Sequence, residues 1–543
     1  MDALFIAINA KYIHTNNAVR LLHANSAFHT DYLEFTIHDD LETITQTILN
    51  KAPKIIGIST YIWNVEETIT LTHMLKEKID TPIILGGPEV SYDPYHFLDN
   101  TPVDVIVRGE GEAIIDTLID ALINQKPLTN ISNITTKKIH TPLTEIKDLS
   151  RLKSPYLNPK DTPHIPKKIA YIEASRGCPY KCSYCLSSQE KTVRFFPTQT
   201  VINHITYLQK QGAKTFKFLD RTFNANKSML SIINHIIKTH EPGQTYQFEI
   251  TGDTLDPKIV EHLHQNAPKD LFRFEIGIQS TNEATNISVD RIQNNEKLFN
   301  IIKTIQDKHI IALHLDLIAG LPKEDLKTFK KTFNDVYALN PKELQLGFLK
   351  MLRGTKIRNQ AERYNYQYNP KAPYQIIQNK WLSKKDIETL TNLEDTLNTF
   401  HNKNHFGPIL APLINNHFTP ADFFLDLYTY TQENAFNLHH YQLDELFKLL
   451  VDFLKTKEIS KQTQTNIHLH YLTRSKVKPK TYFSTVENKT IKQTIYKKLT
   501  HQTNIPLHIF YKHSIILEAN KQYHIVLYQN HQATSYTIKK VDL

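Results

Sequence analysis

The N-terminal part of the chain alternates short apolar runs with amphipathic stretches. The runs are rich in β-branched side chains and lie at residues 3–8, 33–37, 55–59, 83–86 and 104–107. Buried parallel strands have this pattern, and residues 65–76, which follow Asn64 as an expected N-cap, have the spacing of an amphipathic helix. The pattern predicts a doubly wound α/β domain with five strands over residues 1–125.

The pattern changes twice further along the chain. Residues 126–165 are rich in Pro, Thr, Ser, Asn and Lys and lose their periodicity, which predicts a linker. A second series of apolar runs follows, again with helical segments between them, at residues 170–174, 215–219, 247–250, 273–278, 313–318 and 343–349. Six such units predict a partial (β/α)6 barrel over residues 166–365, with chemistry at the carboxyl ends of its strands.

The C-terminal part, residues 366–543, mixes both kinds of pattern. Residues 386–400 and 443–454 have helical spacing, whereas residues 508–517 and 523–528 alternate with a period of two. That alternation predicts a β-meander over about the last 60 residues. The fold class predicted for the whole chain is therefore α/β, with a doubly wound N-terminal domain, a central partial barrel and a C-terminal α+β accessory domain.

The composition is that of an ordinary globular protein. Of 543 residues, 40% are hydrophobic and 22% are charged, and no apolar run reaches the roughly 18 residues that a membrane helix needs. The N-terminus lacks the features of a signal peptide, so we expect a cytoplasmic protein with no membrane partner. Residues 461–543 hold 13 lysines and arginines but only 3 acidic residues, which predicts either an anionic partner such as RNA or a face of solvated lysines.

All three cysteines of the chain lie within residues 178–185, directly after a predicted strand. Cys178, Cys182 and Cys185 have the spacing C-x3-C-x2-C, which lets one loop surround a metal with soft thiolate ligands. Inert buried cysteines would not cluster in this way, and three cysteines do not make a disulfide framework. A structural zinc site needs a fourth ligand, here a histidine, whereas a cubane cluster bound by three thiolates keeps one iron open for another molecule.

The cysteine motif, with Tyr184 just before its last cysteine, resembles that of the radical S-adenosylmethionine (SAM) superfamily. The resemblance implies that the three thiolates bind a [4Fe-4S] cluster and that the open iron binds the amino and carboxylate groups of SAM. One electron, supplied through the cluster by a reductant such as flavodoxin or ferredoxin, cleaves the sulfonium. The products are methionine and a 5′-deoxyadenosyl radical, which abstracts hydrogen from the substrate. The six β/α units agree with the partial barrel of that family.

The same resemblance extends to the ends of the later strands. It implies that SAM contacts Tyr184 and the following side chains: Asp220 in FKFLDRTFN, Glu249 in QFEITGD, Gln279 and Ser280 in RFEIGIQST, and Arg291. The usual Gly-Gly-Glu is missing from the first of these segments, so Asp220 would stand near the amino group. A guanidinium can bind both oxygens of a carboxylate, which makes Arg291 the candidate for the SAM carboxylate. Taken singly, each residue could instead cap a helix or shape a loop, and no catalytic residue is identified.

Glycines follow the predicted N-terminal strands, and in a doubly wound sheet such glycines let a ligand approach the backbone. Together, the segments IIGISTYIWN, IILGGPEVS and DVIVRGEGE resemble the cobalamin-binding domain that precedes the radical domain in many family members. The resemblance implies that the corrin or its nucleotide tail is contacted by Ser59, Thr60, Gly86, Gly87 and Glu89. The alternative is that the glycines form ordinary tight turns.

One motif of many cobalamin proteins is absent. Their Asp-x-His-x-x-Gly segment, whose histidine binds cobalt, would follow the first strand, where this chain has INAKYIHTNNAVR. His14 stands at a different spacing, so we expect it to serve the loop or the start of the next helix instead of cobalt. Radical enzymes of this type often bind cobalamin without a histidine ligand, and cobalamin therefore stays among the expected cofactors.

Together with LDLIAGLP, LKMLRGT and PYQIIQNKWLS, these segments resemble a subgroup that joins a cobalamin-type domain, a radical domain and a C-terminal domain of unknown function. The resemblance implies a cobalamin-dependent radical SAM enzyme that transfers a methyl group or rearranges its substrate, and it names no substrate. One alternative is a radical enzyme that modifies RNA and whose N-terminal domain does not hold cobalamin, in keeping with the basic C-terminal segment. The other is an iron–sulfur or cobalamin sensor, which would not cleave SAM.

Overall fold

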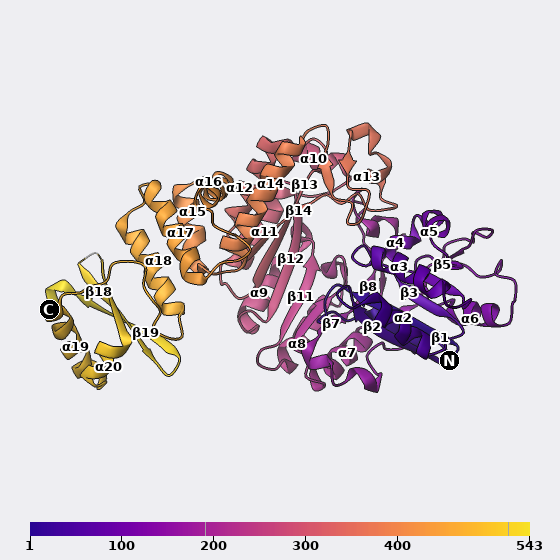
Figure 1. Ribbon diagram of the computed structural model, residues 1–543, viewed down its shortest axis with the longest axis horizontal. Coiled ribbons are helices and arrows are strands. Elements are labelled where there is room, and N and C mark those ends of the chain that lie inside the picture. The colour runs from indigo at the N-terminus through magenta and orange to yellow at the C-terminus, as the bar shows by residue number, and fades with distance from the viewer. Residues whose placement is uncertain (191, 520, 543) are drawn as a thin grey trace. The chain divides into compact units, whose positions relative to one another are not determined.

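The structure is a computed structural model that describes residues 1–190, 192–519 and 521–542 (Figure 1). The chain forms two compact units. The first unit comprises Met1–Lys342 and Leu346–Ile387, and the second comprises Glu343–Gln345 and Glu388–Leu543. All of the candidate site residues belong to the first unit.

The N-terminal domain is a six-stranded sheet with helices on both faces. The strands lie in the order β2-β1-β3-β4-β5-β6, and all neighbours are parallel except β5 and β6. One apolar layer packs under α2 to α5 and another under α1 and α6, which confirms the doubly wound fold. The strands are β1 Ala3–Asn9, β2 Thr30–Thr36, β3 Ile56–Ser59, β4 Ile83–Gly86, β5 Val105–Val107 and β6 Ile134–Thr135. The helices are α1 Asn17–Asn25, α2 Leu41–Asn50, α3 Val65–Lys76, α4 Pro88–Ser91, α5 Pro94–Asn100 and α6 Ile115–Ile123.

The sheet has one strand more than the five that the sequence predicts. β6 lies in the stretch expected to be a linker and pairs antiparallel with β5. β6 has only two residues, which are too few for a periodic pattern from which a strand could be predicted. Helix α3 follows Asn64 as predicted, but the Asn64 side chain makes no capping bond, because its amide donates to the carbonyls of Ile8 (2.8 Å) and Ser59 (3.0 Å).

The central domain is an open sheet of six strands in the order β14-β13-β12-β11-β10-β7, which confirms the partial barrel (Figure 1). The ladders from β7 through β13 are parallel. Side chains alternate along the strands: in β12, every second residue from Phe272 to Ile278 is buried. The strands are β7 Ile169–Ile172, β10 Thr215–Phe218, β11 Thr245–Ile250, β12 Phe272–Gln279, β13 Ala312–Ala319 and β14 Glu343–Phe348. The helices are α7 Thr198–Lys210, α8 Met229–Thr239, α9 Pro257–Asn266, α10 Glu283–Ser288, α11 Asn295–Gln306 and α12 Leu326–Tyr337.

The outer edge of β7 is covered by the loop that follows β1. The Ile169 N–H donates to the Ile13 carbonyl (2.8 Å), and Thr15 Oγ1 donates to the Ile169 carbonyl (3.0 Å). His14 Nδ1 lies 2.7 Å from the Tyr171 hydroxyl, so the ring serves this loop, as its spacing in the sequence leads us to expect. These bonds join the N-terminal and central domains within the first unit.

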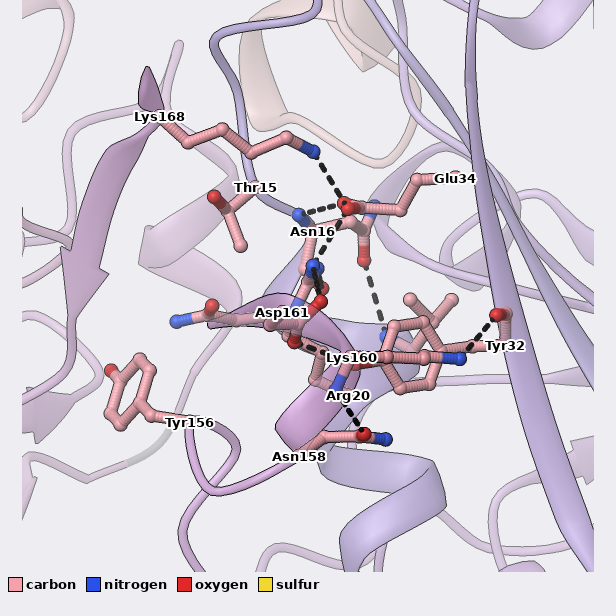
Figure 2. Close-up of polar contacts among 12 residues, drawn as sticks. Thr15, Asn16, Arg20, Tyr32, Glu34, Tyr156, Asn158, Lys160, Asp161 and Lys168 are labelled. Carbon is pink, nitrogen blue, oxygen red and sulfur yellow. Dashed lines mark hydrogen bonds and ion pairs between the residues drawn. The ribbon is translucent and has the colours of Figure 1, made fainter. Parts of the chain in front are cut away.

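The stretch between the two domains is docked on the N-terminal domain by ionic groups with little exposure. These are Arg20, Glu34, Asp161 and Lys168, and we call them the Arg20 cluster. Figure 2 shows the Arg20 guanidinium between two carboxylates: Nε and Nη2 bind Asp161 (2.7 and 2.9 Å), and Nη2 also binds Glu34 (2.7 Å). Lys168 Nζ donates to Glu34 (2.9 Å), and the Tyr32 hydroxyl donates to Asp161 (2.6 Å). Arg20 and Tyr32 are buried, so this stretch is fixed to α1 and β2.

The second unit is α+β, as predicted, with an antiparallel meander in the order β17-β18-β19. The prediction placed the meander too early, because it begins only at Ser514, and residues 507–513 form a helix that follows Pro506. A short apolar run has no period that separates helix from strand, and Phe510 of this helix is buried in the same core as Ile516. The helices are α14 Lys384–Leu397, α15 Leu410–His417, α16 Pro420–Glu433, α17 Leu443–Thr456, α18 Lys461–Arg474, α19 Lys489–Thr503 and α20 Leu507–His513. The strands are β17 Ser514–Ala519, β18 Gln522–Gln529 and β19 Gln532–Lys539. In the described part of both units, no helix is long and apolar enough to cross a membrane.

Candidate functional site

The three cysteines lie in the loop of a hairpin that follows β7. β8 (Ser175–Arg176) and β9 (Arg194–Phe195) pair antiparallel as its stem, and we call these two strands and the loop between them the cysteine hairpin. Cys182 is buried, and Cys178 and Cys185 are partly exposed. No three His, Cys, Asp or Glu side chains of the described residues are grouped closely enough to bind a single metal ion, whereas an iron–sulfur cubane spreads its thiolate ligands over several irons. Three soft thiols on one loop are a donor set that fits such a cluster.

The hairpin is narrowest just before the first cysteine. Gly177 has a φ of +93°, and a Cβ atom there would stand 2.2 Å from the Thr192 carbonyl oxygen, so only glycine fits. Cys178 Sγ lies 3.6 Å from Thr222 Oγ1, and burial raises the pKa of the Cys178 thiol. A thiol must lose its proton to bind iron, and burial makes an isolated thiolate unfavourable at this position. The positive charge of a metal centre would stabilise the thiolate there.

Arg291 supports the cysteine loop from the side of β12. Its Nη1 donates to the Tyr184 hydroxyl (3.2 Å) and lies 3.8 Å from Cys182 Sγ. Its Nη2 donates to the Gly277 carbonyl, and its Nε donates to Gln293 Oε1 (2.9 Å). The structure therefore commits the guanidinium of Arg291, and with it the Tyr184 hydroxyl, to holding the loop.

Two other residues with a predicted role at SAM are also committed to protein contacts. Asp220 accepts from the Ala174 N–H (2.9 Å) and from Ser175 Oγ (2.5 Å), and burial raises the pKa of its carboxyl group to about 7. Ser280 is fully buried and donates to Glu324 Oε1 (2.6 Å). Both side chains hold the ends of strands in place.

Three side chains at the strand ends stay available to a ligand. Gln279 has a φ of +67° at a bulge of β12, and its buried Oε1 meets no hydrogen-bond donor in the described residues. Glu249 is partly exposed near the end of β11, and burial raises the pKa of its carboxyl group. Arg221 Nη1 lies 3.7 Å from Glu249 Oε2, and the Arg221 side chain is 56% exposed. Arg221 is not among the residues that the sequence predicts, although it directly follows Asp220 in the same segment.

Charged and polar side chains line the face of the central sheet that carries Glu249. The register pairs Glu249 with Glu275 and Glu275 with His314 on neighbouring strands, so these side chains share one face. Lys217 Nζ lies 3.4 Å from Glu275 Oε2, and His314 Nε2 lies 3.0 Å from Asp316 Oδ1. A molecule held against this face would therefore be polar.

The ends of β3 and β4 form a narrow cradle of Thr60, Gly86 and Gly87. The Thr60 N–H donates to the Gly86 carbonyl (2.7 Å). Gly87 has a φ of +114°, and a Cβ atom there would stand 2.4 Å from the Thr60 carbonyl oxygen. Thr60 Oγ1 is buried and has no hydrogen-bond partner in the described part of the chain, whereas Ser59 Oγ accepts from Asn16 Nδ2 (3.1 Å). At the cradle, the two glycines expose backbone that no side chain covers, and the Thr60 hydroxyl is available for a hydrogen bond. These features fit a large ligand such as a corrin.

Gly87→Ala is expected to destabilise the first unit by roughly 2–4 kcal/mol, because the new Cβ would overlap a backbone oxygen in a region of φ that strains L residues. Gly86→Ala is the matched control, since its Cβ would meet nothing closer than 3.7 Å. Thermal unfolding of the two variants measures the difference. Similar midpoints for both would show that the close approach at Gly87 is not needed.

Glu89 ends the glycine turn, which we define as residues 86–89, and its side chain faces the segment that follows β14. Its buried carboxylate accepts from the Tyr374 hydroxyl and lies 3.3 Å from Arg353 Nε. A Cβ atom on Gly354 would stand 2.2 Å from Tyr92 Cβ, so the backbone at Gly354 also packs against the Tyr92 side chain. Glu89 therefore fastens the glycine turn to the end of the central sheet.

The cysteine hairpin lies close to the ends of the N-terminal strands. Burial raises the pKa of Tyr92, which follows α4, to about 12, and the nearby charges of Glu190 and Cys185 add to the shift. Arg176 of the hairpin stem binds Glu110 from the turn after β5 (3.0 Å). The stem of the cysteine hairpin and the turn after β5 are thus in direct contact within the first unit, near the carboxyl ends of the parallel strands of both sheets, where ligands bind in such folds.

Three family models match the chain: "B12 binding domain" at residues 4–119, "Radical SAM superfamily" at residues 172–336 and "Protein of unknown function (DUF4080)" at residues 362–540. Among curated proteins, the chain is similar to an uncharacterized methyltransferase, PH0819, from Pyrococcus horikoshii. The two are 25% identical over 329 residues, which are 58% of this chain and 70% of that protein. It is also 24% identical over 348 residues to the cobalamin-dependent radical SAM methyltransferase TokK from Streptomyces tokunonensis, which covers 59% of this chain but only 51% of TokK.

Among solved structures, the chain is similar to the cobalamin-dependent S-adenosylmethionine radical enzyme OxsB with aqua-cobalamin and S-adenosylmethionine bound. The TM-score is 0.58 at 14% identity, over 93% of this chain and 76% of OxsB, which shows a common fold. The family matches confirm the resemblance seen in the sequence. The chain is an enzyme of the radical SAM class, and its cofactors are those of its matched domains: a [4Fe-4S] cluster, SAM and cobalamin. It belongs to the radical SAM superfamily, as a member with an N-terminal B12-binding domain and a C-terminal DUF4080 domain.

Proposed function

We propose that the chain is a cobalamin-dependent radical SAM methyltransferase. The observation that carries this proposal is the contact of the cysteine hairpin with the turn after β5, on the strand next to the one that ends in the glycine turn, inside one compact unit. Transfer of a methyl group to an unactivated carbon requires a radical source, a methyl carrier and the substrate in one space, and this arrangement can bring them together. The similarity to PH0819 and TokK, both named as methyltransferases, supports the same reaction.

In this proposal the three cysteines bind the cluster, which supplies the electron that cleaves SAM. Arg221 binds the SAM carboxylate, because its exposed guanidinium can offer two parallel donors. Glu249 accepts from the SAM amino group, and Gln279 Oε1 accepts from a hydroxyl group of the ribose. Asp220 and Ser280 act indirectly, by fixing the strand ends that carry these residues.

The Thr60, Gly86 and Gly87 cradle binds the corrin in this proposal, and the bound cobalamin would carry the methyl group. The two glycines give the corrin access to the backbone, and Thr60 Oγ1 is free to donate to one of its amide side chains. The His14 ring is already bonded to the Tyr171 hydroxyl, which favours cobalamin without a histidine ligand from this loop.

The charged face of the central sheet indicates the kind of substrate. Lys217 on β10, Glu275 on β12 and Asp316 on β13 stand on this face and present both signs of charge. A polar substrate with its own charged or hydrogen-bonding groups would be bound by this face, whereas a purely apolar one would leave these groups without partners. A flavodoxin or ferredoxin is the proposed source of the electron.

The proposal is tested on the full-length protein under anaerobic conditions. Protein reconstituted with iron and sulfide is incubated with cobalamin, separated from free corrin by gel filtration, and given dithionite and SAM. Retained corrin together with 5′-deoxyadenosine is the expected result, and S-adenosylhomocysteine should accompany methyl transfer. Cleavage of SAM without retained corrin would favour an enzyme that modifies RNA, and 5′-deoxyadenosine with retained corrin but without S-adenosylhomocysteine would favour rearrangement. A cluster that never cleaves SAM would favour a sensor.

Arg221→Ala is expected to weaken SAM binding roughly 10- to 100-fold, the loss typical of a charge-assisted hydrogen bond, and to leave the iron content unchanged. Arg291→Ala is expected to lower the iron content and to lower SAM binding only in proportion to the lost cluster, because Arg291 contacts Cys182 and Tyr184 and supports the loop that binds iron. Equilibrium dialysis with SAM and an iron assay on the two variants separate these effects. Unchanged SAM affinity in Arg221→Ala would refute its role.

A further inference from the structure

Two arginines face each other across the stem of the cysteine hairpin. Arg176 of β8 is the register partner of Arg194 of β9, and their side chains are only 11% and 9% exposed. Like charges directly opposite each other on antiparallel strands repel. The stem therefore depends on negative charge supplied by another part of the chain.

Glu110, from the turn after β5, supplies negative charge to both arginines. Arg176 Nη1 donates to Glu110 Oε1 (3.0 Å), and Arg194 Nη1 donates to both Glu110 oxygens (2.9 and 2.8 Å). The Ile146 N–H also donates to Glu110 Oε2 (2.6 Å). Burial alone would raise the pKa of Glu110, but the bonds from Arg194 and Ile146 and the charge of Arg176 hold it below its ordinary value. The carboxylate between the arginines is thus ionised.

The two arginines differ in their other partners. Arg176 also binds Glu112 (2.7 Å) and Glu173 (3.0 Å). Arg194 also lies near the carboxylate of Glu190, at 3.7 Å. Among the described residues, Glu110 is the carboxylate that bonds to both arginines, and Arg194 depends on it most.

We propose that Glu110 is a positioning residue for the iron–sulfur cluster: it fixes the stem of the cysteine hairpin to the N-terminal domain and sets the charge beside the cysteine loop. Arg176 stands two residues before Cys178, so a movement of the stem is passed directly to the first cluster ligand. The inference rests on cluster binding by the three cysteines, which is part of the proposed function, and does not depend on the reaction catalysed. Because Glu110 lies in the B12-binding domain, that domain helps to set the position of the cysteine hairpin and the charge beside the cluster.

Removing the charge of Glu110 would take one negative charge from the arginine pair near the cluster and would leave Arg194 without its closest counter-charge, whereas Arg176 keeps Glu112 and Glu173. A reduced cluster carries one more negative charge than an oxidised one, so added positive charge favours reduction. Glu110→Gln is expected to shift the reduction equilibrium about tenfold toward the reduced cluster, which is about 59 mV upward for a one-electron couple. Arg194→Gln removes a cation and leaves Glu110 in place, and is expected to shift the equilibrium about tenfold in the other direction.

The experiment is a potentiometric titration of the full-length, cluster-loaded protein, followed by electron paramagnetic resonance. Glu34→Gln is the matched control, because Glu34 also joins two cations, Arg20 and Lys168, but at the opposite end of β7 (Figure 2). It is expected to lower stability as Glu110→Gln does and to leave the potential unchanged. Glu110→Asp keeps the charge and is expected to keep a potential near that of the wild type.

Shifts of opposite sign in Glu110→Gln and Arg194→Gln would support the proposal. Shifts of the same sign, or shifts no larger than that of Glu34→Gln, would overturn it, because loosening of the hairpin alone does not depend on the sign of the charge removed. If Glu110→Gln does not fold, a downward shift in Arg194→Gln still supports the proposal, and an unchanged potential there overturns it. A wild-type protein that binds no cluster contradicts the proposed function instead, so the two failures can be told apart.

Discussion

Cys182→Ala is expected to abolish both iron binding and SAM cleavage. The chain has only three cysteines, so no other thiol can replace the lost ligand, and two thiolates on an open loop do not hold a cubane cluster. Iron and sulfide per chain should fall to the level of unreconstituted protein, and 5′-deoxyadenosine should fall to the level of a reaction without enzyme. The effect is a complete loss and not a change in affinity, because the open iron is itself the binding site for SAM in this family.

Ser183→Ala is the matched control for this experiment. Ser183 is the next residue of the same loop and is buried, and its hydroxyl has no hydrogen-bond partner among the described residues. Its removal is expected to leave iron content and cleavage within about twofold of the wild type. Cluster binding that survives in Cys182→Ala would refute the assignment of this cysteine as a ligand.

Arg20→Ala is expected to lower the free energy of unfolding of the first unit by about 3–5 kcal/mol. The substitution would leave Glu34 and Asp161 as neighbouring carboxylates, only 11% and 13% exposed, without the cation that lies between them. Both tryptophans of the chain, Trp63 and Trp381, belong to the first unit, so urea unfolding followed by tryptophan fluorescence reports on this unit.

The control for Arg20→Ala is a pair at the surface. Lys51 lies 3.9 Å from Asp31, and both side chains are far more exposed than that of Arg20. Lys51→Ala is expected to change the stability by no more than about 1 kcal/mol, as is usual for exposed pairs. Equal losses in the two variants would show that the Arg20 cluster contributes no more than a surface ion pair.

The Arg20 cluster also predicts a dependence of stability on pH. Burial alone would raise the pKa of Glu34, but Arg20 and Lys168 lower it from 4.5 to about 2. A carboxyl group with a lowered pKa in the folded state stabilises above the unfolded pKa, and this contribution is lost as the pH falls from about 4.5 to about 2. The loss in the wild type is expected to reach about 3 kcal/mol, and Arg20→Ala should show a much smaller change over the same range.

The parallel strands could be predicted from the sequence because each is an apolar, β-branched run, and the cysteine loop could be predicted because its residues are local. The remaining features depend on contacts between distant residues. Arg194 and Glu110 are 84 residues apart, and Arg20 and Asp161 are 141 residues apart, so no local pattern links them. For the same reason the docking of residues 126–165 is not visible in their composition, which is that of an unstructured stretch.

The predicted SAM contacts show a second limit of the sequence. A motif indicates which segment stands at the end of a strand, but it does not say which side chain of that segment is turned outward. Asp220 and Arg221 are neighbours, yet the carboxylate is buried against Ser175 while the guanidinium is exposed. Packing decides which of the two side chains is buried, because the Asp220 carboxylate at the end of β10 accepts a hydrogen bond from the Ala174 N–H at the end of β7.

The covering of the β7 edge has a consequence for how this chain can be divided into fragments. An unpaired edge of a parallel sheet exposes a row of N–H and carbonyl groups, which other chains can join and which promotes aggregation. Here Ile13 and Thr15 occupy that row at Ile169. A fragment that began at the central domain would lose this protection, so we expect the barrel to stay monomeric only when it is produced together with the N-terminal domain.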